Sequence, residues 1–369
     1  MRGLAVCAPD KLRGALDARG AAAALARGAR AAGWDAVEHP LADGGEGTAD
    51  VLLAARGGRR VEVDATDARG RPCRAALVLL DDGTAVVETA AAIGLAQLAA
   101  ADRDPLTATS AGAAALVRAA LDAGAPRIVL CLGGSATVDG GLGLLAALGA
   151  SVRDGDGRPL AGVGADLDVV AVVERDGLDP RLADVELVVA CDVASPLTGP
   201  DGAAHVFGPQ KGASPADVQR LDAGLARLGR LLGPAAGVAG AGAAGGLGAA
   251  CAWLGAAVVP GADLVIAETG LPERLAGAAV CLTAEGRIDA STLAGKTVAR
   301  VVAASAAAGV PCVAVGGALG PGHEALYERG AAAVLCASDG PGTLDEALTG
   351  AADGLARAAR AACGLVRPR

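Results

Sequence analysis

Residues 128–132 constrain the fold of this chain most, because they form a charge-free apolar run that ends at two consecutive glycines. Such a run is typical of a parallel strand that is covered on both faces. The residues that follow, "GGSATVDGGLG" (133–143), are mostly small or polar and must turn. Ligands of open α/β sheets bind at the carboxyl ends of parallel strands. The segment therefore predicts an α/β protein with a functional loop after this strand.

Strand and helix signals alternate at both ends of the chain. "GLAVCA" (3–8) predicts a strand, and Asp17 is placed to cap a helix that stops near residue 33. Strand signals alternate with helical stretches again between residues 279 and 336. Residues 59–89 instead hold three apolar runs and an Asp-Gly turn, which favours antiparallel or mixed pairing. With 369 residues, the chain is long enough that two α/β domains are expected.

Composition excludes several classes of protein. Four aromatic residues and a net charge of -9 argue against nucleic-acid binding, which needs stacking platforms and a basic surface. Nine cysteines without a C-x-x-C pair are typical of reduced thiols, and no secretory signal is seen, so a cytoplasmic protein is expected. Residues 231–262 carry no charge, but nine glycines and two prolines there favour a loop and a core helix over a membrane span.

Six polar, glycine-rich loops recur at predicted strand or helix ends: "APDKLRG" (8–14), "ADGGEGT" (42–48), "GGSATVDGG" (133–141), "CDVASPLTGPDGA" (191–203), "FGPQKGA" (207–213) and "AEGRIDASTLAGKT" (284–297). Any one of them is compatible with an ordinary turn. Together they supply what phosphoryl transfer needs: backbone N–H groups that can approach phosphate, cations that neutralise charge, and carboxylates that can hold magnesium.

Lysine usage supports this interpretation. The chain has three lysines against 29 arginines, and all three lie in these loops. A lysine retained in such a composition indicates a position that needs a compact point charge. The basic candidates are Lys11, Arg13, Lys211, Arg287 and Lys296. The acidic candidates are Asp10, Asp43, Glu46, Asp139, Asp192, Glu285 and Asp289.

Two further motifs favour other functions weakly. "GAGAAG" (240–245) fits the dinucleotide fingerprint, but a segment with Pro234 and two glycines precedes it where a strand is required. It supports a nicotinamide-dependent hydroxyacid oxidoreductase as the alternative enzyme. "LAGKT" (293–297) resembles the end of a P-loop without its first glycine. A catalytically silent ligand-binding protein remains the alternative outside enzymes.

The loops also resemble, in order and over nearly the whole chain, those of the bacterial glycerate kinases. The resemblance rests on "APDKLRGAL", "LADGGEGTAD", "GGSATVDGGLGLLAALGA", "ACDVASPLTGPDGAAHVFGPQKGAS", "GAGAAGGLGAA", "EGRIDASTLAGKT" and "GTLDEAL". It implies a fold distinct from P-loop kinases: a flavodoxin-like parallel sheet built from both chain ends (1–65 plus 280–369) and an inserted mixed α/β domain (66–279). The active site is then expected in the cleft between the two domains.

The same resemblance implies ATP-dependent phosphorylation of D-glycerate to 2-phosphoglycerate, with Mg²⁺ as the metal. Glycerate 3-kinase activity is the alternative within this chemistry. The expected partners are these small molecules, with neither nucleic acid nor membrane, and a homodimer is left open.

Roles can be assigned to matching residues as expectations. Asp192 is the first choice for the catalytic base, with Asp43 and Asp289 as alternatives and Lys211 as a catalytic cation. Substrate-binding residues are Asp10, Arg13, Gly44, Gly45, Glu46 and Arg287. Nucleotide-binding residues are Gly133, Gly134, Ser135, Thr137, Asp139, Gly242, Gly245, Gly246 and Lys296. Asp192 and Glu285 are expected to hold the metal.

Overall fold

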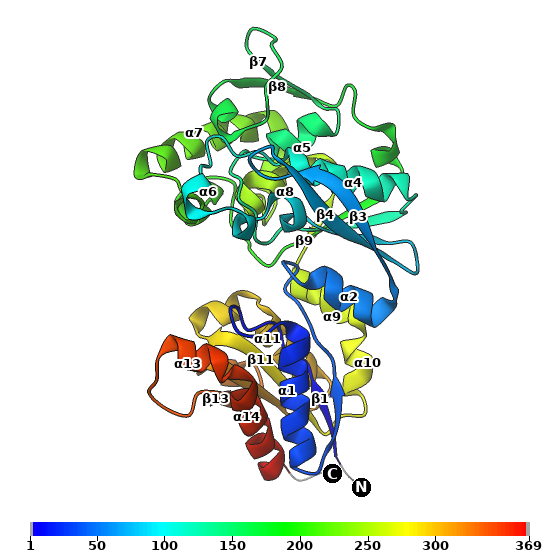
Figure 1. The fold of residues 1–369 in the computed structure, drawn as a ribbon, viewed down its shortest axis with the longest axis vertical. Coiled ribbons are helices and arrows are strands. Elements are labelled where there is room, and N and C mark those ends of the chain that lie inside the picture. Colours follow the sequence, from blue (N-terminus) through cyan, green and yellow to red (C-terminus); the bar gives the residue numbers. More distant parts are fainter. Residues whose placement is uncertain (1–2, 367–369) are drawn as a thin grey trace. The chain divides into compact units, whose positions relative to one another are not determined.

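A computed structural model describes residues 3–366 and divides the chain into two compact units (Figure 1). The first unit comprises residues up to 43, residues 50–55 and residues from 262 onward; the second comprises 44–49 and 56–261. The chain passes between the units at 43/44, 49/50, 55/56 and 261/262, whereas the borders expected from the sequence are 65/66 and 279/280. Both units are α/β, and the predicted discontinuous organisation of the chain is present.

The first unit contains a five-stranded parallel sheet with the order β13-β12-β11-β1-β2. Its strands are β1 (Leu4–Cys7), β2 (Asp35–Glu38), β11 (Val280–Ile288), β12 (Cys312–Leu319) and β13 (Ala331–Cys336). Strand β1, from the N-terminal region, lies beside β11 with Ala5 opposite Val280. This pairing joins the two ends of the chain in one sheet, as the sequence predicts.

The first unit also contains helices. They are α1 (Ala18–Ala31), α9 (Gly261–Thr269), α10 (Leu271–Leu275), α11 (Thr297–Ala307), α12 (Ala325–Glu328), α13 (Leu344–Thr349) and α14 (Ala351–Leu365), with the 3₁₀ helix η7 (Ala290–Ala294) and α2 (Thr48–Arg56), most of which belongs to this unit. Asp17 caps α1 as predicted, since its Oδ1 accepts a hydrogen bond from the Gly20 N–H at 2.6 Å. A Cβ at Gly28 would lie 2.1 Å from the Ala356 carbonyl oxygen, so α1 and α14 pack very closely (Figure 1).

The second unit contains a six-stranded mixed sheet with the order β10-β9-β6-β5-β4-β3. Its strands are β3 (Gly58–Thr66), β4 (Pro72–Leu80), β5 (Ala85–Glu88), β6 (Arg127–Cys131), β9 (Glu186–Ala190) and β10 (Ala257–Val259). The first three pair antiparallel and the rest parallel, which confirms the mixed sheet. A separate antiparallel pair is formed by β7 (Ser151–Asp154) and β8 (Val170–Glu174).

The helices of the second unit surround a core of leucine, valine and alanine. They are α3 (Ala90–Ile93), α4 (Ala111–Asp122), α5 (Leu142–Ala147), α6 (Ala203–Phe207), α7 (Pro215–Leu232) and α8 (Ala243–Trp253), with 3₁₀ helices η1 (Leu95–Gln97), η2 (Ala100–Asp102), η3 (Gly164–Asp168), η4 (Pro180–Ala183), η5 (Pro209–Lys211) and η6 (Gly233–Gly237). The charge-free stretch at 231–262 forms η6, the buried helix α8 and β10. No helix within residues 3–366 is long and apolar enough to cross a membrane.

Candidate active site

The first unit contains a cavity of about 510 Å³ at the carboxyl ends of β1 and β11. We call it the strand-end pocket and define it by its charged lining residues: Asp10, Lys11, Arg13, Asp43, Glu285, Arg287 and Lys296. These residues come from three segments that are far apart in sequence: the loop after β1, the loop before α2, and the end of β11 with the loop that follows it. Parallel pairing of β1 with β11 brings the first and third segments together, because the carboxyl ends of parallel strands share one edge of the sheet.

Asp10 is almost fully buried at the end of β1, with 8% of its surface exposed. Its Oδ1 accepts a hydrogen bond from the Lys11 N–H at 2.6 Å, and its Oδ2 accepts one from Thr297 Oγ1 at 2.8 Å. Burial and the nearby Asp43 carboxylate raise the pKa of Asp10 to about 6, against the opposing charge of Lys11. The carboxylate is thus held in a fixed orientation inside the pocket.

Lys11 connects the two acidic groups on this side of the pocket. Its Nζ lies 3.0 Å from Asp43 Oδ1 and 3.9 Å from Asp10 Oδ1. Burial disfavours the charged amine, but the two carboxylates outweigh it and raise the pKa of Lys11. This lysine therefore carries a positive charge at neutral pH.

Glu285 is the second buried carboxylate of the pocket. It lies on β11 with 9% of its surface exposed, and its Oε1 accepts a short hydrogen bond from Thr292 Oγ1 in η7. Burial raises the pKa of Glu285 to about 7, although the Thr292 hydrogen bond and the charge of Lys296 oppose this. Thr292 and Thr297, which orient the two buried carboxylates, were not among the predicted site residues.

The outer cations of the pocket are more exposed. Arg287 donates from Nε to Asp289 Oδ2 at 3.0 Å, and Lys296 donates from Nζ to Ser291 Oγ at 2.9 Å. Asp289 itself caps η7, because its Oδ1 accepts from the Ser291 N–H at 2.9 Å and from Ser291 Oγ at 2.6 Å. These hydrogen bonds from Ser291 lower the pKa of Asp289, so it is poorly suited to accept a proton.

Lys211, predicted as a catalytic cation, lies inside the second unit. Only 3% of its surface is exposed, and its Nζ donates to the Thr137 carbonyl oxygen at 2.7 Å and to Ser135 Oγ at 3.1 Å. Burial lowers the pKa of Lys211 to about 7, and the negative charge of Asp139 opposes this shift only in part. The described contacts of this lysine hold the 133–139 loop in place.

Asp139 organises the other side of the same loop. It is fully buried and accepts hydrogen bonds from the Ser110 N–H at 2.7 Å, Ser110 Oγ at 2.6 Å, the Gly141 N–H at 3.0 Å and the Gly143 N–H at 3.2 Å. Burial raises its pKa, while these four donors oppose that shift. The carboxylate therefore ties the start of α4 to the start of α5.

The glycines predicted to line the nucleotide have a packing role in the second unit. A Cβ at Gly245 would lie 2.0 Å from the Thr137 carbonyl oxygen, and one at Gly246 would lie 2.7 Å from Gly140 Cα. A Cβ at Gly242 would lie 2.1 Å from the Pro196 carbonyl oxygen. The "GAGAAG" segment follows η6 rather than a strand, so the structural context of a dinucleotide fingerprint is missing.

The predicted substrate-binding residues divide between the units. Asp10, Arg13 and Arg287 line the strand-end pocket. Gly44, Gly45 and Glu46 belong to the second unit, where a Cβ at Gly133 would lie 2.7 Å from Gly45 Cα. Gly134 follows with a φ of +79°.

The two residues predicted to hold the metal also lie in different units. Asp192 is half-buried in the loop after β9 of the second unit, whereas Glu285 belongs to the first. Among residues 3–366, no group of three or more His, Cys, Asp or Glu side chains is arranged to hold a metal ion. Magnesium is commonly bound through one or two carboxylates together with substrate phosphates and waters. Asp10 and Glu285, both lining the strand-end pocket, match that donor set.

Comparisons with known proteins agree on one family. The model of the Glycerate kinase family matches residues 5–367. The glycerate kinase of Bacillus subtilis (strain 168) is 40% identical over 364 residues, which cover 96% of this chain and 95% of the relative. The glycerate 2-kinase of Escherichia coli (strain K12) is also 40% identical, over 96% of both chains. A crystal structure described as glycerate kinase 2 from Salmonella typhimurium LT2 superposes with a TM-score of 0.84 at 40% identity, over 98% of each chain.

Proposed function

The chain belongs to the glycerate kinase family and is a kinase, and we propose that it transfers the γ-phosphoryl group of ATP to D-glycerate, giving 2-phosphoglycerate. The name of the Escherichia coli relative, a glycerate 2-kinase at 40% identity, supports this product. That similarity supports the substrates and the position of phosphorylation, and the charges that line the strand-end pocket fit two anionic substrates.

The observation that carries the proposal is the pairing of four cationic side chains with two buried, oriented carboxylates in one cavity. Glycerate carries a carboxylate, and the transferred phosphoryl group spreads negative charge over its oxygens. Guanidinium groups such as Arg13 and Arg287 suit planar or bidentate anion recognition, whereas the lysines supply point charges. A pocket with this lining fits both anions at once.

The reaction requires three events at defined atoms. The C2 hydroxyl oxygen of glycerate forms a bond to the γ-phosphorus, the bond from that phosphorus to the β,γ-bridging oxygen breaks, and the hydroxyl proton moves to a carboxylate. Asp43 lines the strand-end pocket beside Lys11, so we assign the proton to Asp43. Asp192, in the second unit, is the alternative acceptor. Asp289 is less suited because it caps η7.

Magnesium would be held by Asp10 and Glu285 together with phosphate oxygens, and it would neutralise charge on the triphosphate. Thr297 and Thr292 orient these carboxylates through the hydrogen bonds described above. The cations of the pocket position the two anionic substrates, and this positioning supplies much of the rate enhancement.

The test is phosphorus NMR of the purified protein with ATP, Mg²⁺ and D-glycerate, beside the Asp43→Asn and Asp192→Asn variants. A 2-phosphoglycerate signal that falls about 100-fold or more in the Asp43 variant, the size expected for losing a general base, supports both product and base. Loss only in the Asp192 variant moves the base to that residue. A 3-phosphoglycerate signal keeps the kinase and overturns the product, and no phosphorylated glycerate from folded protein overturns the proposed function.

A further inference from the structure

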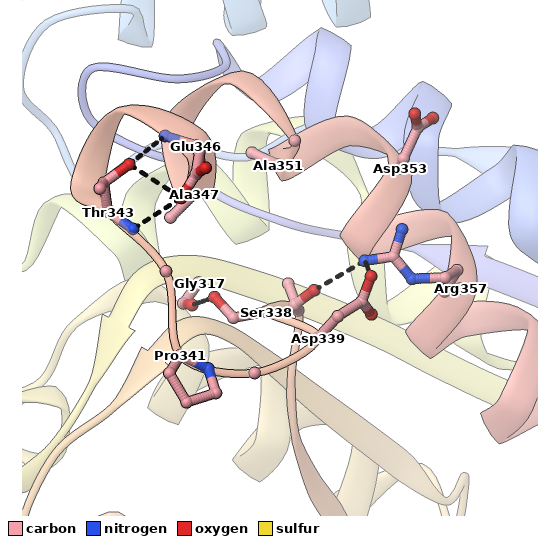
Figure 2. Close-up of a pocket in the computed structure, with 14 residues that line it drawn as sticks. Gly317, Ser338, Asp339, Pro341, Thr343, Glu346, Ala347, Ala351, Asp353 and Arg357 are labelled. Atoms are coloured by element: carbon pink, nitrogen blue, oxygen red, sulfur yellow. Dashed lines mark hydrogen bonds and ion pairs between the residues drawn. The ribbon is translucent and has the colours of Figure 1, made fainter.

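A second cavity of about 470 Å³ lies beside the strand-end pocket in the first unit. We call it the loop pocket, since the segment 338–343 curves around it between β13 and α13 (Figure 2). Its lining residues with polar side chains are Ser338, Asp339, Thr343, Glu346, Asp353 and Arg357. The proposed reaction assigns no role to it.

The two cavities share part of their lining. Gly317, at the end of β12, and Ala347 and Ala351, on α13 and α14, contribute to both. Together the cavities follow the carboxyl ends of β1, β11, β12 and β13, which are neighbours in the sheet. Three interstrand steps of about 4.8 Å span roughly 14 Å, which is comparable with an extended nucleoside triphosphate.

The two cavities differ in charge. The strand-end pocket contains Lys11, Arg13, Arg287 and Lys296, whereas the loop pocket contains a single cationic side chain, Arg357. The Nη2 atom of Arg357 lies 2.6 Å from Asp339 Oδ2, so that cation already has an acidic partner. Asp353 is likewise paired, since Arg27 Nη2 lies 2.6 Å from its Oδ1, so Glu346 adds the remaining negative charge and the lining offers no surplus cation to a phosphate group.

We propose that the loop pocket binds the nucleoside of the phosphoryl donor, whose phosphates then extend into the strand-end pocket. This inference rests on the proposed phosphoryl transfer. It places the nucleoside on the first unit, whereas the sequence-based expectation assigned the nucleotide to the loops at 133–139 and 242–246 together with Lys296, which lines the strand-end pocket. A Cβ at Gly242, Gly245 or Gly246 would meet backbone atoms of the second unit at 2.0–2.7 Å, so these three glycines serve packing there.

The lining suits an uncharged sugar and base. Carboxylates such as Asp339 and Glu346 can accept hydrogen bonds from ribose hydroxyls, and Ala347, Ala351 and Pro341 give aliphatic walls. Figure 2 shows the Thr343–Glu346 pair and the Asp339–Arg357 pair at the rim of this cavity. An aliphatic cavity is also the kind expected from a chain with four aromatic residues.

The first experiment separates the nucleoside from the phosphates. Calorimetry measures the dissociation constants of ADP and of inorganic tripolyphosphate, both with Mg²⁺, for the wild type and for Gly340→Phe. Gly340 lines the loop pocket, and nothing lies within 4 Å of its Cβ position. Gly155→Phe is the matched control, because Gly155 has an equally open Cβ position in the loop after β7 of the second unit.

We expect Gly340→Phe to weaken ADP binding about tenfold or more and to change tripolyphosphate binding less than about twofold. Gly155→Phe should change neither, and Arg13→Ala should weaken both. Equal affinity of the wild type for ADP and tripolyphosphate, or an unchanged ADP affinity in Gly340→Phe, overturns the inference.

A second experiment locates the nucleoside without any variant. Photolabelling of the wild type with 8-azido-ATP, followed by tryptic digestion, should mark the peptide 330–357, which contains the loop pocket. Label in the peptide 128–153 would instead place the nucleoside on the second unit and overturn the inference. Label in 330–357 without glycerate phosphorylation would keep this inference and overturn the proposed function.

Discussion

The buried amine of Lys211 predicts a contribution to stability that depends on pH above neutrality. Burial lowers the folded pKa of this lysine to about 7, whereas an exposed lysine in the unfolded chain titrates near 10.4. Between these values the unfolded chain binds one more proton than the folded chain. The free energy of unfolding therefore rises with pH by up to about 1.4 kcal/mol per pH unit. Below about pH 7 both states are protonated, and this contribution stays at its minimum.

The assay is urea unfolding of the wild type and Lys211→Met between pH 7 and pH 9.5. Between pH 7 and pH 9.5 the contribution amounts to roughly 3–3.5 kcal/mol as an upper estimate, and the stability of the variant should lack it. Methionine also leaves the Thr137 carbonyl oxygen without this donor, at a cost of about 1–3 kcal/mol that does not change with pH. The prediction concerns how steeply the free energy of unfolding changes with pH in the wild type and in the variant. The absolute free energies of the two proteins can differ in either direction.

Direct observation is feasible because the chain contains only three lysines. In protein labelled with ¹³Cε-lysine, three signals are expected, and the one lost in Lys211→Met should titrate near neutral pH. The signal of Lys11 should titrate above the ordinary lysine range, because Asp10 and Asp43 raise its pKa despite burial. If the stabilities of the wild type and Lys211→Met depend on pH in the same way, and the Lys211 signal titrates above about pH 10, the account of Lys211 is refuted.

Three other predictions follow from contacts within single units. Burial and the charge of Arg274 lower the pKa of His39 to about 4, so the folded state loses stability as pH falls from about 6.5 toward 4; His39→Gln should remove that loss in acid unfolding curves. Gly28→Ala should lower the free energy of unfolding by about 1–3 kcal/mol through the clash with the Ala356 carbonyl oxygen, whereas Gly277→Ala, with nothing within 4 Å, should not lower it. Asp139→Asn should destabilise by about 1–3 kcal/mol, because an amide cannot accept from all four donors at once; an unchanged urea midpoint would contradict this.

Local signals in the sequence predicted local structure well. The apolar run before Gly133 is β6, and Asp17 caps α1, because each depends on residues within a few positions of one another. The mixed character of residues 59–89 was also predicted, since alternation and a turn signal are visible in one stretch. The borders between the two units have no local signal, because they depend on pairings between segments that are far apart in the sequence, such as β9 with β10.

The sequence named several residues of the strand-end pocket, but their grouping depends on the pairing of distant strands. Asp10, Arg13 and Glu285 were all among the candidates, and they line one pocket because β1 and β11 pair in parallel. The loop pocket was not predicted, although "GTLDEAL" (342–348) supplies part of its lining, because that segment carries only the capping signal of α13. Its position becomes evident when the order of the strands is known.

Comparisons among the lysines and among the glycines show why a loop rich in glycine and charged residues need not contact a ligand. Lys11 and Lys296 line a cavity, whereas Lys211 donates to a carbonyl oxygen within its own unit and is 3% exposed. Gly245 is required because Thr137 approaches it closely, whereas nothing lies near the Cβ position of Gly340. In both comparisons the residue type is identical and burial separates the roles. A mutation that removes activity at Lys211 or Gly245 should therefore also lower the urea midpoint, whereas Gly340→Phe should change nucleotide affinity in a protein of unchanged stability.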